Sequence, residues 1–157
     1  MKYTCFKGTH WFLPVIPRFY WNKKQFEWII NFDSSCDYYF DENGKYDINK
    51  AIGVSQYLNP RKNSIRFGWR FNTETELIEI SCFKEINYTF EINVIKSVER
   101  NKDINLKAQL YKGLAILSVD DEMYITASNL YSKLLIRTNP YFGGTEVSPH
   151  KMKISIN

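Results

Sequence analysis

Two arginines on one predicted strand have the types and spacing to bind an anion. Arg66 and Arg70 flank Gly68 in the alternating segment Asn63–Phe71, so both side chains leave the same face, roughly 13 Å apart along the backbone. A guanidinium group can hold a carboxylate or phosphate through two parallel hydrogen bonds. The spacing therefore allows a shallow site for an anion or an acidic partner across the bare backbone of Gly68. The alternative is an exposed ion pair between Arg70 and Glu79, which would contribute only about 0–1 kcal/mol.

Aromatic side chains near strand ends and loops form a second set of candidates, because an exposed ring can stack on the apolar face of a sugar. Aromatic residues make up 17% of the chain. Trp28 and Trp69 alternate with apolar neighbours, and this pattern places them in the core. The candidates for an exposed ligand platform are Trp11, Trp21, Tyr38, Tyr39 and Tyr141.

Catalytic signatures are weak in this chain. Its two histidines are His10 and His150, and no serine lies in a G-x-S-x-G segment. A glycosidase needs two carboxylates on either side of the scissile bond, and the nearest pattern is Glu74, Glu76 and Glu79. The first two of these fall in a predicted hairpin loop. We therefore expect a non-catalytic protein.

No metal or cofactor is expected either. The acidic residues that could coordinate calcium are Asp33, Asp37, Asp41, Asp120 and Asp121. Their spacing does not follow a calcium-binding loop, and turn formation explains them. Gly143–Gly144 precedes no helical pattern, so the pair predicts a tight turn and not a phosphate cradle.

Charge and cysteine content limit the partners and the compartment. The 157 residues carry 21 Lys and Arg against 17 Asp and Glu, without the dense basic stripe of a nucleic-acid-binding protein. Cys5, Cys36 and Cys82 show no C-x-x-C spacing, which is typical of reduced thiols. The apolar run Trp11–Ile16 is interrupted by Pro14, so it predicts neither a signal peptide nor a membrane span. We expect a cytoplasmic or virion protein that could assemble with itself or with other chains.

The elements that must position these residues are strands, because alternation with a period of two dominates the chain. Asn63–Phe71 and the run that begins at Ile78 form a predicted hairpin, with Trp69 opposite Ile80 and Arg70 opposite Glu79. Further predicted strands are Phe26–Phe32, Asp37–Phe40, Tyr88–Ser97, Asn105–Tyr111, Leu114–Val119, Met123–Ala127, Leu130–Thr138 and Lys151–Asn157.

Two segments depart from this pattern. Trp11–Trp21 contains two prolines, which predicts an edge strand or an irregular segment. Asp47 could cap one helical turn over Ile48–Ile52, which Gly53 would end. With about ten strands and frequent turn signals, the sequence predicts one all-β domain over residues 1–157. Its expected fold is an antiparallel two-sheet β-sandwich of jelly-roll type, with at most one or two short helical turns.

Two stretches resemble the concanavalin A-like and laminin G-like jelly rolls. Gly113–Asp121 is similar to a strand and turn of that fold, and Asn139–Gly144 with Met152–Ile156 is similar to its Gly-Gly element and closing strand. Phe67–Arg70 and Tyr141–Gly144 also resemble segments of small uncharacterised β-sandwich proteins of bacteria and their phages. The resemblance implies a non-catalytic binding or structural module for a glycan or protein surface, in a phage virion or as another phage-encoded component. A glycan-hydrolysing enzyme and an intracellular phage effector that binds a host protein or nucleotide are the alternatives.

Overall fold

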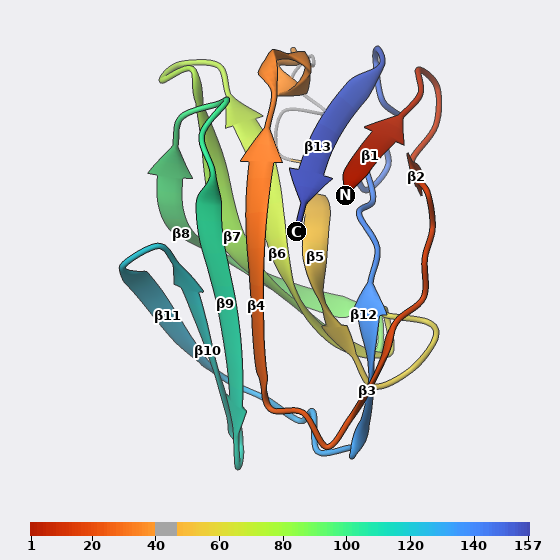
Figure 1. Cartoon of the computed structure of the whole chain (residues 1–157), viewed down its shortest axis with the longest axis vertical. Coiled ribbons are helices and arrows are strands. Elements are labelled where there is room, and N and C mark those ends of the chain that lie inside the picture. Colours follow the sequence, from red (N-terminus) through yellow and green to blue (C-terminus); the bar gives the residue numbers. More distant parts are fainter. Residues whose placement is uncertain (40–46) are drawn as a thin grey trace.

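A computed structural model describes residues 1–39 and 47–157 as two antiparallel β-sheets packed face to face (Figure 1). Sheet A contains, in spatial order, β11 (Glu122–Ala127), β10 (Leu114–Val119), β9 (Ile104–Tyr111), β4 (Gln25–Phe32), β13 (Met152–Ile156), β1 (Lys2–Cys5) and β2 (Phe12–Leu13). Sheet B contains, in spatial order, β3 (Phe19–Trp21), β12 (Leu134–Thr138), β5 (Asn49–Ser55), β6 (Asn63–Asn72), β7 (Leu77–Ile86) and β8 (Thr89–Val98). The predicted all-β sandwich is confirmed, and the helical structure of the described residues is one 3-10 turn, Ser34–Cys36.

The central hairpin of sheet B has the predicted register. β6 pairs with β7 so that Trp69 lies opposite Ile80 and Arg70 lies opposite Glu79. A shift of one residue would turn every apolar side chain of β6 away from the core. The apolar alternation therefore fixes the pairing.

Two local predictions are wrong. The segment after Asp47 is strand β5 and not a helical turn, because Ile52 and Val54 fill the core between β12 and β6. The strand predicted over Asp37–Phe40 does not form in its described part: residues 37–39 follow the 3-10 turn without regular structure, and Phe40 lies outside the described residues. The proline-containing segment forms the short edge strands β2 and β3, as predicted.

Aromatic rings fill the space between the sheets. Trp69 is fully buried, and its ring centre lies 5.0 Å from that of Phe32 on sheet A and 5.9 Å from that of Tyr38. Trp28 is also buried, as predicted, and meets Phe67 edge to face. Large rings from both sheets therefore hold the two layers together.

The three cysteines lie in the interior of the molecule. Cys5, Cys36 and Cys82 are buried and form no disulfide, and burial raises the pKa of the Cys82 thiol to about 12. In the part of the chain that the structure describes, no helix has the length and apolar character needed to cross a bilayer.

Candidate functional site

The outer face of sheet B, which points away from sheet A, carries a layer of polar and charged side chains on its central strands. Successive side chains of a strand point to opposite faces, so the residues next to core residues such as Phe67 and Ile80 lie on the outer face. The residues of this face on β5, β6 and β7, which include two glycines and one phenylalanine, are Lys50, Gly53, Ser55, Ser64, Arg66, Gly68, Arg70, Glu79, Ser81, Phe83 and Glu85. All except Arg70 and Glu79 are buried, so little of the centre of this face is exposed to bulk water.

Arg66 is buried within this layer. Its guanidinium donates to the Glu85 carboxylate and sits 4.8 Å from the centre of the Phe83 ring. A Cβ on Gly53 would lie 2.2 Å from the backbone carbonyl oxygen of Ile65 and 2.5 Å from Cα of Arg66. Glycine at position 53 therefore lets β5 lie this close to the backbone of β6.

Lys50 reaches the same ring from β5. Its Nζ lies 4.5 Å from the centre of the Phe83 ring and donates to the Gly143 carbonyl at 3.0 Å. Burial, followed by the nearby positive charge of Arg66, lowers the pKa of Lys50 to about 8. Two cations thus share one phenyl ring.

The same ring also makes an aromatic contact. Phe90 on β8 stacks on Phe83 with ring centres 5.5 Å apart and planes inclined by 19°. Phe83 therefore contacts a second ring as well as the two cations.

An exposed arginine borders the cluster. Nε of Arg61 donates to Glu85 at 3.2 Å, and its guanidinium lies 4.9 Å from the centre of the Tyr88 ring. Glu85 therefore binds two arginines at once, one buried and one exposed.

The candidate aromatic platform consists of Trp11, Tyr141 and His10. Trp11 is 58% exposed, and its ring meets Tyr141 edge to face at 5.0 Å. Tyr141 stacks in parallel on His10 at 5.1 Å, and the His10 ring contacts the Phe142 carbonyl through Nδ1. Tyr141 also pairs through its backbone with Lys50, so the platform adjoins the charged cluster.

The structure separates the predicted anion-binding pair. Arg70 donates to Glu79 at 2.6 Å and so forms the ion pair that was the alternative to the anion site. Arg66 donates to Glu85 instead. The backbone of Gly68 is not bare: a Cβ there would lie 2.6 Å from Ile48 Cγ2 and equally close to Ser81 Oγ. The predicted anion site across Gly68 therefore does not form.

The other predicted platform residues lie apart. Tyr38 is only 5% exposed, which corrects its place among the exposed candidates, because its ring packs on Trp69 and its hydroxyl accepts from Asn49. Trp21 is 73% exposed on the edge strand β3. Tyr39 is exposed and meets Phe71 edge to face. Of the predicted set, only Trp11 and Tyr141 touch each other among the described contacts.

The acidic candidates that the structure describes take part in turns and ion pairs. Asp33 caps the 3-10 turn, and Asp37 pairs with Arg100. Lys96 reaches Asp121 at 2.8 Å, and Asp41 lies outside the described residues. Within residues 1–39 and 47–157, no three His, Cys, Asp or Glu side chains gather as metal ligands.

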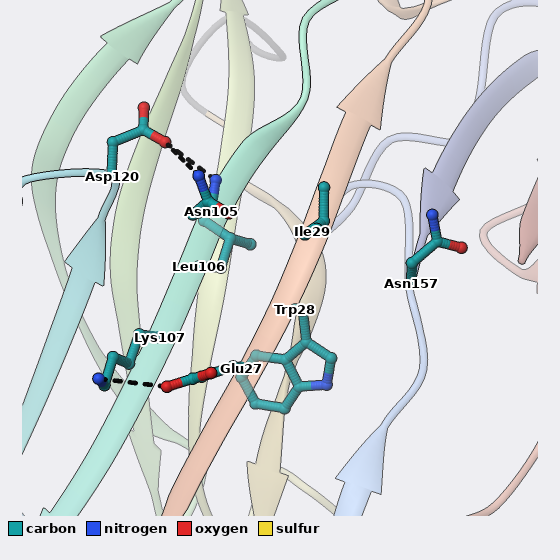
Figure 2. Close-up of a pocket in the computed structure, with 8 residues that line it drawn as sticks. All are labelled: Glu27, Trp28, Ile29, Asn105, Leu106, Lys107, Asp120 and Asn157. Carbon is teal, nitrogen blue, oxygen red and sulfur yellow. Dashed lines mark hydrogen bonds and ion pairs between the residues drawn. The ribbon is translucent and has the colours of Figure 1, made fainter.

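A shallow hollow of about 430 Å³ lies on the outer side of sheet A (Figure 2). Its polar side chains are already paired with one another: Lys107 lies 3.2 Å from Glu27, and Asp120 accepts from the backbone N–H of Asn105 at 2.9 Å. This hollow therefore offers few free groups to a ligand, and the outer face of sheet B is the stronger candidate.

Sequence reasoning missed the three residues that surround Arg66. Lys50, Phe83 and Glu85 come from two neighbouring strands, and Lys50 lay in a predicted helical turn. The alternation that marks β6 extends into β7, so the pairing register could have placed Glu85 and Phe83 on the outer face. No local signal brings Lys50 to the same ring.

Comparison with known proteins shows the fold. No protein-family model matches the chain, and no curated protein is found as a relative. A functionally unknown protein from Saccharomyces cerevisiae superposes with a TM-score of 0.57 at 12% identity, over 90% of this chain and 72% of that one. The PL7 alginate lyase AlyA1 from Zobellia galactanivorans gives a TM-score of 0.55 at 10% identity, over 99% and 76%.

A third similar structure is described among endo-acting O-glycanases that human gut microbiota express to initiate mucin breakdown. It gives a TM-score of 0.54 at 13% identity, over 99% of this chain and 78% of that one. The chain therefore has a concanavalin A-like jelly-roll fold, as its sequence resemblance implied. Identities this low establish the fold alone.

Proposed function

We propose that this protein is a glycan-binding module without catalytic activity, which binds its ligand at the rim of the outer face of sheet B. The observation that carries the proposal is the platform of Trp11, Tyr141 and His10. Trp11 is exposed, yet its ring packs against the edge of Tyr141, which itself stacks on His10. A ring that is oriented before binding loses little conformational entropy when a sugar stacks on it.

Two solved structures of the same fold support a glycan ligand. One is described as an alginate lyase and the other as part of a group of mucin O-glycanases. The protein-surface ligand, the phage setting and the effector alternative have no comparable support and stay predictions from the sequence.

The carboxylates of the outer face support a non-catalytic role. Glu79 and Glu85 are six residues apart on β7, roughly 20 Å along a strand, whereas paired glycosidase carboxylates lie about 5–9.5 Å apart. Each of the two is also bound to an arginine. Neither is placed to act with the other on one glycosidic bond.

Native gel electrophoresis in the presence of alginate, xylan, laminarin or mucin tests the proposal. We expect at least one polymer to retard the protein, and Trp11→Ala to weaken this retention at least tenfold. Trp21→Ala is the matched control, because it removes an even more exposed indole from β3. Equal retention of wild type and Trp11→Ala, or no retention by any polymer, would refute the proposal.

The same mixtures test for catalysis. Incubation with each retarding polymer should release no reducing ends above a heat-inactivated sample. A time-dependent release that scales with protein concentration would instead support the glycan-hydrolysing alternative.

A further inference from the structure

The buried layer of sheet B holds more positive than negative charge. Lys50 is 8% exposed and Arg66 is 5% exposed, while the one carboxylate of the layer that is equally buried is Glu85. Glu85 is shared between Arg66 and the exposed Arg61. Asp47 also faces Lys50, but its carboxylate is held by backbone N–H groups of the Gly143–Glu146 turn. A buried charge is costly unless an opposite charge compensates it.

Hydrogen-bond donors are in excess at the same place. An ammonium group has three N–H donors, and the acceptor found for Lys50 among the described residues is the Gly143 carbonyl. Nε of Arg66 and the hydroxyl of Ser81 have no hydrogen-bond partner in the described part of the chain. Buried polar groups without partners are rare in folded proteins, so these donors indicate an acceptor that residues 1–39 and 47–157 do not supply.

The shared ring limits where that acceptor could lie. Phe90 stacks on Phe83, and both cations lie within 5 Å of the centre of the Phe83 ring. A negatively charged oxygen between the two cations could bond to both Lys50 and Arg66. An oxygen there would also reduce the repulsion between the two cations.

We propose that the space beside Lys50, Arg66 and Phe83 is an oxyanion site, which takes a carboxylate or sulfate group. The inference that a sugar carries this group rests on the proposed function, because Tyr141 connects the platform to Lys50 through backbone hydrogen bonds. The inference that the site binds an anion rests only on the excess positive charge and the unpaired donors. The site thus uses Arg66 as the sequence suggested, with Lys50 in place of Arg70.

Thermal unfolding with inorganic sulfate, and with chloride at equal ionic strength, tests the anion site. At a tenfold excess over its dissociation constant, sulfate should raise the unfolding midpoint by about 3–6 °C. Lys50→Met should abolish this increase and raise the midpoint without sulfate, because it removes a buried uncompensated charge. Lys102→Met is the matched control, since Lys102 is exposed and pairs with Glu99. An equal sulfate response in wild type and Lys50→Met would overturn the proposal.

A second measurement applies even if Lys50→Met does not fold. Burial lowers the pKa of Lys50 to about 8, so sulfate affinity should fall as the pH rises through that value and the ammonium loses its proton. An affinity that is constant from pH 7 to pH 9.5 would contradict a role for Lys50.

Oligosaccharides separate failure of this inference from failure of the proposed function. Trimannuronate should bind the wild type at least tenfold more tightly than xylotriose, and Trp11→Ala should weaken trimannuronate without changing the sulfate response. Sulfate binding without any oligosaccharide binding would refute the glycan-binding function alone. Xylotriose binding equal to that of trimannuronate would refute the oxyanion site alone.

Discussion

At the scale of single residues, the neighbouring strand decides what each outward-facing arginine of β6 does. Arg66 and Arg70 each meet a glutamate of β7. Arg66 is covered and borders an unbalanced charged cluster, whereas the side chain of Arg70 stays 25% exposed. The same residue type therefore serves a candidate binding site at one position and a surface ion pair at the other.

The ion pair of Arg70 and Glu79 should contribute little to stability. In a double-mutant cycle with Arg70→Ala and Glu79→Ala, we expect a coupling energy below about 1 kcal/mol, because the partly exposed pair competes with water. Urea unfolding of the four proteins measures it. A coupling energy above about 2 kcal/mol would show that the pair is effectively buried.

Trp69 should be a major determinant of stability. Its ring is fully buried against Phe32, Tyr38 and Phe142, so Trp69→Ala should lower the free energy of unfolding by about 3–5 kcal/mol. The exposed Trp21→Ala is the control and should change it by less than about 0.5 kcal/mol. A loss below about 1 kcal/mol for Trp69→Ala would contradict its place in the core.

At the scale of elements, one carboxylate connects the start of β5 to a distant turn. Asp47 Oδ2 accepts from the backbone N–H groups of Gly144, Thr145 and Glu146 at 3.0–3.1 Å. Desolvation acts to raise the pKa of Asp47, but these hydrogen bonds outweigh it and lower the pKa below its ordinary value. The glycine-containing turn thus binds an anion that belongs to the chain itself.

Removal of this carboxylate should destabilise the fold in a pH-dependent way. At pH 7 we expect Asp47→Ala to cost about 1–3 kcal/mol, since three N–H groups lose their acceptor. The folded pKa is lowered, so the contribution is present above the unfolded pKa and disappears as the pH falls through the folded pKa. Urea unfolding from pH 7 down to pH 3 should show the difference between wild type and variant shrinking. A constant difference over this range would contradict the ionised role.

At the scale of the whole molecule, the chain crosses repeatedly between the two sheets. β1 and β13 pair within sheet A, while β3 and β12 pair within sheet B (Figure 1). Segments from both ends of the chain therefore contribute to both layers.

This arrangement predicts a single cooperative unit over residues 1–157. Far-UV circular dichroism and tryptophan fluorescence should report one urea transition with the same midpoint, because neither sheet can keep its core without the other. Two separated transitions would instead show independently folding parts. The far-UV spectrum should also lack the double minimum of a helical protein.

The sequence by itself determined the features that depend on local alternation. The period of two in Asn63–Phe71 assigned each side chain of β6 to a face, and burial of one face then fixed the register with β7. The burial of Trp28 and Trp69 followed from the same pattern.

Only the tertiary structure decided the features that depend on which strands become neighbours. β5 is a strand because it lies between β12 and β6, although its short sequence also suits a helical turn. The burial of Tyr38 and the contact of Trp11 with Tyr141 depend on how irregular segments fold back on the sheets. Lys50 and Phe83 meet across β6 because side chains two strands apart share a face. Such contacts depend on the order of the strands in the sheet, and no periodic pattern in the sequence encodes that order. The face on which a residue lies depends only on the geometry of its own strand.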